Sequence, residues 1–126
     1  MSDFAASARE AAEEARILFQ ASHYSGACSR AYYAMFNAAR AMLLAKGQKR
    51  ESAKTHKTVL RLFSHEFVQD GTFDAELARA LRKAADARHI ADYEGGVGRD
   101  EAAVVMATLE AFMREAEAYF GQKDTA

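Results

Sequence analysis

Apolar residues recur along this chain with the 3.6-residue period of an α-helix. The pattern is interrupted several times by glycines and short polar clusters, and none of these interruptions is long enough to be a domain linker. The sequence therefore predicts five helical segments, at about 2–21, 25–46, 53–69, 74–93 and 100–120.

Residues that favour helix ends lie between these segments. Ser2 or Asp3, Asp74 and Asp100 are predicted N-caps, since their side chains can accept a hydrogen bond from the first backbone N–H groups. His23-Tyr24-Ser25-Gly26 is predicted to be the first turn. The later stop signals are Gly47, Asp70-Gly71-Thr72 and Gly95-Gly96.

Four long helices with short connections predict an all-α, up-and-down bundle of four to five helices in a single domain, residues 1–126. The composition agrees, because the chain has no Pro and is rich in Ala, whereas Val, Ile and Thr are scarce. The segment 25–46 is apolar around much of its circumference. We therefore expect it to be the most buried helix and to contribute to a homodimer interface.

The net charge and the cysteine content limit which ligands and which cell compartment fit this protein. The net charge of −1 gives no global attraction to nucleic acid, so any basic binding surface must be local. Cys28 is the one cysteine and cannot form an internal disulfide, which indicates a reducing compartment. We expect a cytoplasmic protein with no membrane partner, because the sequence has no secretory signal and no apolar run of membrane-spanning length.

The segment 74–93 is apolar in its first half and polar near its end. Arg88 and Asp92 continue the apolar stripe with an i,i+4 pair, which predicts that they bond to each other. The adjacent face of the same helix carries Arg82, Asp86, His89 and Tyr93. The candidate catalytic cluster is therefore Arg88, Asp92, Tyr93, His89 and Arg82.

The segment 25–46 supplies a second polar face. Arg30 and Asn37 fall on one side of it, among alanines that allow close backbone approach. Two interpretations stay open. Arg30 and Arg88 either bond carboxylates or helix ends and hold the bundle in register, or they form a polar binding site at one end of the bundle or across a dimer axis.

The stretch 46–57 contains five basic residues and one acid. It either tracks a phosphate backbone or is a solvated loop, and its candidate binding residues are Lys49, Arg50 and Lys54. His23, His56 and His65 have no partner at metal-ligand spacing, and the sequence has no glycine-rich phosphate loop. We therefore expect neither a metal nor a cofactor.

Several short motifs, in this order and spacing, resemble the small stand-alone HEPN proteins of prokaryotes. They are SRAYYAMF at 29–36, Thr55-His56-Lys57, Phe67-Val68 followed by Gly71, and Arg88 spaced to Ala91-Asp92-Tyr93. The resemblance covers residues 10–120. It implies a helical bundle that is commonly dimeric, is often encoded beside a minimal nucleotidyltransferase, and acts in a toxin-antitoxin or defence module.

Active proteins of that family are metal-independent ribonucleases with an Arg, four to six residues, and then a His. Here Tyr93 occupies the position at which a His is expected with four residues between it and Arg88, whereas Arg82 and His89 have six residues between them. The leading hypothesis is thus a homodimeric partner of a nucleotidyltransferase, with a degenerate RNA or nucleotide site at Arg88, Asp92 and Tyr93. A separate hypothesis is that Tyr93 accepts a nucleotide, and the sequence does not decide whether it is modified. The alternatives are a metal-independent endoribonuclease that uses Arg82 or Arg88 with His89, and a nucleotide- or RNA-binding bundle without turnover.

Overall fold

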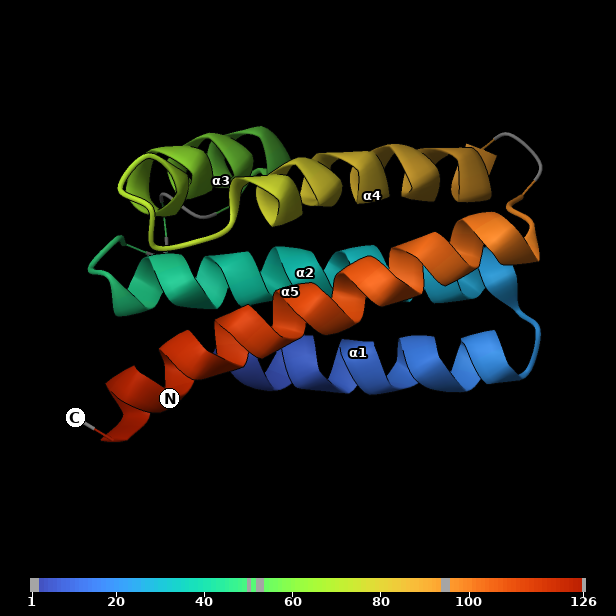
Figure 1. Ribbon diagram of the computed structural model, residues 1–126, viewed down its shortest axis with the longest axis horizontal. Helices are drawn as coiled ribbons and strands as arrows, with labels where there is room; N and C mark the ends of the chain where they lie inside the picture. The colour runs from blue at the N-terminus through green and yellow to red at the C-terminus, as the bar shows by residue number, and fades with distance from the viewer. Residues whose placement is uncertain (1–2, 50, 52–53, 94–95, 126) are drawn as a thin grey trace.

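The computed structural model describes residues 3–49, 51, 54–93 and 96–125, and the side chains of 4–49, 51, 54–86 and 96–120. Within these residues the secondary structure is helical and contains no strand, which confirms the predicted all-α fold. The long helices α1, α2, α4 and α5 alternate in direction, and the shorter α3 lies between α2 and α4 in the chain (Figure 1).

Helices α1 (Asp3–Gln20) and α2 (Tyr24–Ala45) form an antiparallel pair. The face of α1 that packs inward is made of small residues, which let the two helix backbones approach closely. These residues are Ala5, Ala8, Ala11, Ala12 and Ala15. The predicted alanine stripe is therefore the buried face of α1.

Helix α3 (His56–Phe63) continues directly into a π-helical segment, η2 (Ser64–Val68). The predicted helix at 53–69 therefore begins later and is not regular throughout. It begins later because the Thr55 hydroxyl caps it, accepting a hydrogen bond of 3.1 Å from the Thr58 N–H. At its end, the Gln69 N–H donates to the Ser64 carbonyl, five residues back, at 3.1 Å.

Helices α4 (Ala75–Tyr93) and α5 (Arg99–Thr125) complete the bundle. Aromatic rings from α3, η2, α5 and the loop before α4 pack together as one cluster, which consists of Phe63, Phe67, Phe73 and Phe112. All four rings are buried. This cluster attaches the short α3–η2 segment to the long helices.

Two predicted helix starts are wrong by one to a few residues. Helix α2 begins at Tyr24, so most of the predicted turn at 23–26 is helix; the Ser25 hydroxyl instead accepts the Val97 N–H at 3.0 Å. Helix α5 begins at Arg99 and the Ala102 N–H bonds to the Gly98 carbonyl, so Asp100 lies in the first turn rather than at the cap. A negative charge favours that turn through the helix dipole.

Helix α2 is the central helix of the bundle, as its apolar circumference predicts. Helices α1, α3, α4 and α5 all pack against it, so its apolar surface is covered within a single copy of the chain. The reasoning that a homodimer is needed to bury α2 is therefore wrong. The homodimer itself stays a prediction.

Candidate functional site

The predicted catalytic cluster lies in the last turns of α4, which the structure forms as one continuous helix through Tyr93. The side chains of Arg88, His89, Asp92 and Tyr93 lie outside those that the structure describes. The Arg88–Asp92 pair and the role of Tyr93 therefore remain predictions from the sequence.

Arg82 is the one member of that cluster whose side chain is described. It is exposed on α4 and faces the α3–η2 segment across a cavity of about 560 Å³. The other residues that line this cavity are Lys57, Leu60, Arg61, Ser64, His65 and Gln69. Arg82 is thus placed among basic residues of another helix, a neighbourhood that its own sequence context does not reveal.

Arg30 forms a partly exposed ion pair between α2 and α1. Its Nη1 lies 3.3 Å from Glu14 Oε1 of α1, and its guanidinium stacks on the Tyr33 ring at 4.8 Å. The bond to a carboxylate is the one that the structural interpretation of Arg30 expects, although an exposed pair of this kind contributes little to stability. A cavity of about 180 Å³ lies beside Arg30 between α1 and α2, lined by both acidic and basic groups. A binding role of Arg30 stays a prediction.

Asn37 is buried in α2, with 2% of its surface exposed. Its Oδ1 accepts a long hydrogen bond of 3.4 Å from Arg40 Nη1, and its Nδ2 has no hydrogen-bond partner in the described part of the chain. Arg30 and Asn37 therefore point to different partners and do not form one polar site.

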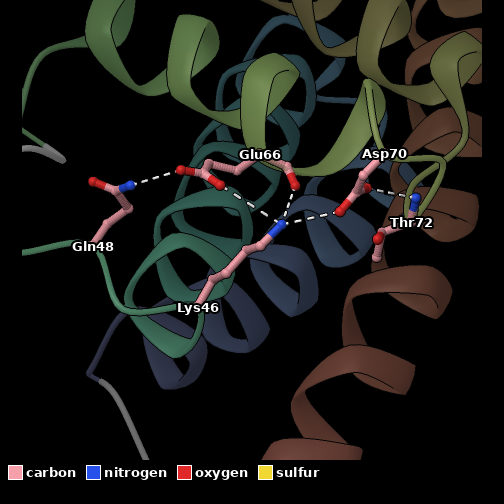
Figure 2. Close-up of polar contacts among 5 residues, drawn as sticks. All are labelled: Lys46, Gln48, Glu66, Asp70 and Thr72. Carbon is pink, nitrogen blue, oxygen red and sulfur yellow. Dashed lines mark hydrogen bonds and ion pairs between the residues drawn. The ribbon is translucent and has the colours of Figure 1, made fainter.

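The described residues of the basic stretch at 46–57 differ in their surroundings. Lys49 and Lys54 are exposed, whereas Arg50 lies outside the described residues. Lys46, at the C-terminal end of α2, is instead bound into a cluster with η2 and the loop after it (Figure 2).

In that cluster the Lys46 ammonium donates to the Glu66 carbonyl and lies 3.1 Å from Asp70 Oδ2. Gln48 Nε2 donates to Glu66 Oε1 at 2.9 Å. Hydrogen bonds from Thr72, together with the one from Lys46, lower the pKa of Asp70 to about 2. The hydrogen bond to Asp70 likewise raises the pKa of Lys46. The cluster holds the end of α2 to η2. Within it, the positive charge of Lys46 is paired with the carboxylates of Glu66 and Asp70.

A second polar contact was not expected from the sequence. The hydroxyl of buried Tyr32 lies 2.6 Å from His56 Nδ1, and the imidazole stacks on the Phe36 ring at a centroid distance of 4.3 Å. His56 is therefore a structural residue at the start of α3. The 24-residue separation of Tyr32 and His56 explains why helix periodicity could not predict the pair.

Two further findings on the described residues concern metal binding and membrane insertion. Among them no group of three or more His, Cys, Asp or Glu side chains is placed to hold a metal ion. In the same part of the chain, no helix is both long enough and apolar enough to span a membrane.

Comparison with known proteins gives the family. The HEPN domain family matches residues 1–119. A protein of Methanocaldococcus jannaschii named "Putative toxin MJ0142" is 29% identical over 119 residues, which cover 93% of this chain and 79% of that protein. The protein "UPF0332 protein glr0978" of Gloeobacter violaceus is 33% identical over 118 residues, 91% of each chain. The helical bundle and these matches agree with the resemblance found in the motifs, and the chain belongs to the HEPN family.

Proposed function

We propose that this protein is the HEPN component of a two-gene toxin-antitoxin or defence module, with a minimal nucleotidyltransferase as its partner. The observation that carries the proposal is membership of the HEPN family together with the names of two M. jannaschii relatives, "Putative toxin MJ0142" and "Putative toxin MJ0605". The second relative is 37% identical over 86 residues, 68% of this chain and 62% of that protein.

The residues at the end of α4 support a binding or acceptor role for this component more than catalysis. The Arg88-anchored motif has Tyr93 where the ribonucleases of the family have His. A phenol with an ordinary pKa of about 10 is a poor base at neutral pH, because it holds its proton there. Arg88 supplies a cation for a phosphate group, so the site keeps affinity for RNA or nucleotide without turnover.

Tyr93 is suited to accept a nucleotide from the partner enzyme. Its Oη attacks the α-phosphorus of ATP, the bond between the α- and β-phosphates breaks, and pyrophosphate leaves. Asp92 is the neighbouring carboxylate that takes the phenol proton. The product is a phosphodiester between tyrosine and AMP.

Intact-mass measurement tests this proposal. The purified protein is incubated with its nucleotidyltransferase and ATP, and an added AMP mass is expected on the wild type and absent from Tyr93→Phe. Tyr33→Phe is the matched control, because Tyr33 is also an exposed tyrosine, 43% accessible, on another helix. The Tyr33→Phe variant should still accept the adduct on Tyr93. An adduct that persists in Tyr93→Phe contradicts the assignment of Tyr93.

Expression in cells tests the module itself. Induction of this chain alone should slow growth, and co-expression of the nucleotidyltransferase should restore it. Unimpaired growth in both cases contradicts a toxin-antitoxin role. The same preparations, measured by light scattering, test the proposed homodimer, and a monomer at micromolar concentration contradicts it.

One observation favours the endoribonuclease as a second candidate. Arg82 lies exposed in a basic cavity and has no ion pair within the described part of the chain, so its charge is free to bind a phosphorane. In this alternative His89, six residues further along α4, transfers the proton. His89→Ala should then lower RNA cleavage by about 10²- to 10⁴-fold.

A further inference from the structure

A groove runs between the α3–η2 segment and α4, and its walls are basic on both sides. Lys57, Arg61 and His65 lie on one wall at four-residue intervals, and Arg82 lies on the opposite wall. The main cavity of the groove measures about 560 Å³. This volume falls within the range of ordinary small-ligand sites.

Within the described residues, the three cations of this groove have no acidic partner. No carboxylate is among the residues that line the cavity, and Lys57, Arg61 and Arg82 form no salt bridge with a described side chain. Glu66, the acid nearest in sequence to the α3–η2 wall, is held by Lys46 and Gln48 in the cluster shown in Figure 2. Uncompensated cations that share a concave surface attract an anionic ligand.

Basic residues elsewhere in the described structure are of both kinds. Arg9 binds Glu117, Arg16 binds Glu110, and Arg30 binds Glu14, whereas the exposed Lys83 and Arg114 form no salt bridge with a described residue. What distinguishes the groove is that three such cations line one concave surface.

The shape of the groove indicates what kind of anion it takes. Lys57 and Arg61 are one turn apart, about 6 Å along the helix axis, so the charges extend beyond the size of a single phosphate. Next to them lies a second cavity of about 170 Å³, which shares Leu60, Ser64 and Arg82 with the first and adds Arg79 to the basic lining. A ligand that carries several phosphates along its length fits these walls, and a nucleotide chain has this feature.

We propose that this groove binds the phosphate groups of a nucleotide ligand, with Lys57, Arg61 and Arg82 as the phosphate contacts. A short segment of single-stranded RNA is the ligand that best matches the length of the basic wall. The inference rests on the proposed function only in taking nucleotide phosphates as the ligand. The groove shares Arg82 with the candidate catalytic cluster, and binding there does not need Tyr93 as an acceptor.

Fluorescence anisotropy with a labelled single-stranded RNA of ~10 nucleotides tests the proposal at several salt concentrations. The groove variant is Lys57→Gln with Arg61→Gln. The matched control is Lys83→Gln with Arg114→Gln, which removes the same charge from exposed residues outside the two groove cavities. Circular dichroism checks that both double variants retain the helical fold.

The groove variant should bind the RNA about tenfold more weakly or worse, and the control should stay within about threefold. The slope of the logarithm of the binding constant against the logarithm of salt concentration should flatten by about 1.4 in the groove variant, since each lost phosphate contact removes about 0.7. Adding Arg82→Gln should weaken binding again, because the ligand lies between both walls.

ATP and inorganic phosphate serve as competitors that identify the source of the phosphates. Competition by ATP that is lost in the groove variant shows that a mononucleotide is sufficient, and no competition shows that the chain form is required. Equal loss of RNA binding in the two double variants, or no binding of either RNA or ATP to the wild type, overturns the proposal. The AMP adduct on Tyr93 is measured separately by intact mass, and the Lys57→Gln, Arg61→Gln variant should still accept it. Failure of the groove proposal is therefore distinguishable from failure of the Tyr93 proposal.

Discussion

Phe63 attaches α3 to the bundle, and its truncation is the sharpest test of the packing. The ring is 1% exposed and contacts three others, at centroid distances of 4.9 Å to Phe73, 5.2 Å to Phe67 and 5.8 Å to Phe112. Phe63→Ala removes the ring and leaves a cavity, which costs about 3–5 kcal/mol in cores of this kind. Three ring contacts keep the expected loss above the lower end of this range, at about 4 kcal/mol.

For a chain of 126 residues, this loss of unfolding free energy corresponds to a fall in Tm of about 15 °C. Urea and thermal unfolding followed by circular dichroism measure it. Phe63→Leu keeps an apolar side chain of similar size and should lose only about 1–2 kcal/mol. Val104→Ala, at a side chain that is 67% exposed, should change the unfolding free energy by less than about 0.5 kcal/mol. A loss below about 1.5 kcal/mol for Phe63→Ala would refute the reasoning.

Three other perturbations have expected outcomes. Gly47 has φ +110° with open space around it, so Gly47→Ala should destabilise the fold by about 1–2 kcal/mol in urea unfolding. Gly26 lies in a helix, where the new methyl makes only ordinary contact, so Gly26→Ala should be neutral or stabilising by up to about 1 kcal/mol. The pKa of Asp70 is about 2 in the folded protein and ordinarily 3.8, so its stabilising contribution is present above about pH 4 and is lost as pH falls toward 2. Asp70→Asn should therefore unfold more easily than wild type at pH 7, and the difference should be much smaller at pH 2, where about half of Asp70 is protonated in the folded protein. A difference that is the same at both pH values would contradict this. Removal of Arg88 or Asp92 alone should cost about 3 kcal/mol if their pair is buried, and a double-mutant cycle without coupling would show that they do not act together.

Helix periodicity predicted the fold class because each long helix has one dominant buried face. The alanines of α1 and the apolar residues of α5 repeat at the spacing of their helix, so sequence alone locates them in the core. Helix ends were harder to predict. Ser25 and Gly26 are typical turn residues, yet both lie in the first turn of α2. The Ser25 hydroxyl accepts the Val97 N–H, and Leu18 of α1 lies close to where a side chain of residue 26 would begin, so tertiary structure overrides the local preference.

The features that the sequence could not predict depend on contacts between segments that lie far apart in the chain. A helix apolar on every side indicates either a central position or an oligomer interface, and the sequence of α2 alone does not distinguish the two. The Tyr32–His56 bond and the opposition of Arg82 to Arg61 depend on how α2, α3 and α4 are arranged. The i,i+4,i+8 spacing of Lys57, Arg61 and His65 was the available signal for the basic groove, since it places these residues along one side of α3 and η2.

The most direct test of the proposed function is RNA cleavage by the purified protein in the presence of a metal chelator. Wild type is compared with a variant lacking both Arg82 and Arg88 and with His89→Ala. A degenerate HEPN partner protein should release no more product than the Arg82, Arg88 double variant. Chelator-insensitive cleavage that His89→Ala lowers by about 10²- to 10⁴-fold, with an inflection in the pH profile near the pKa of His, would contradict the account and establish the ribonuclease instead.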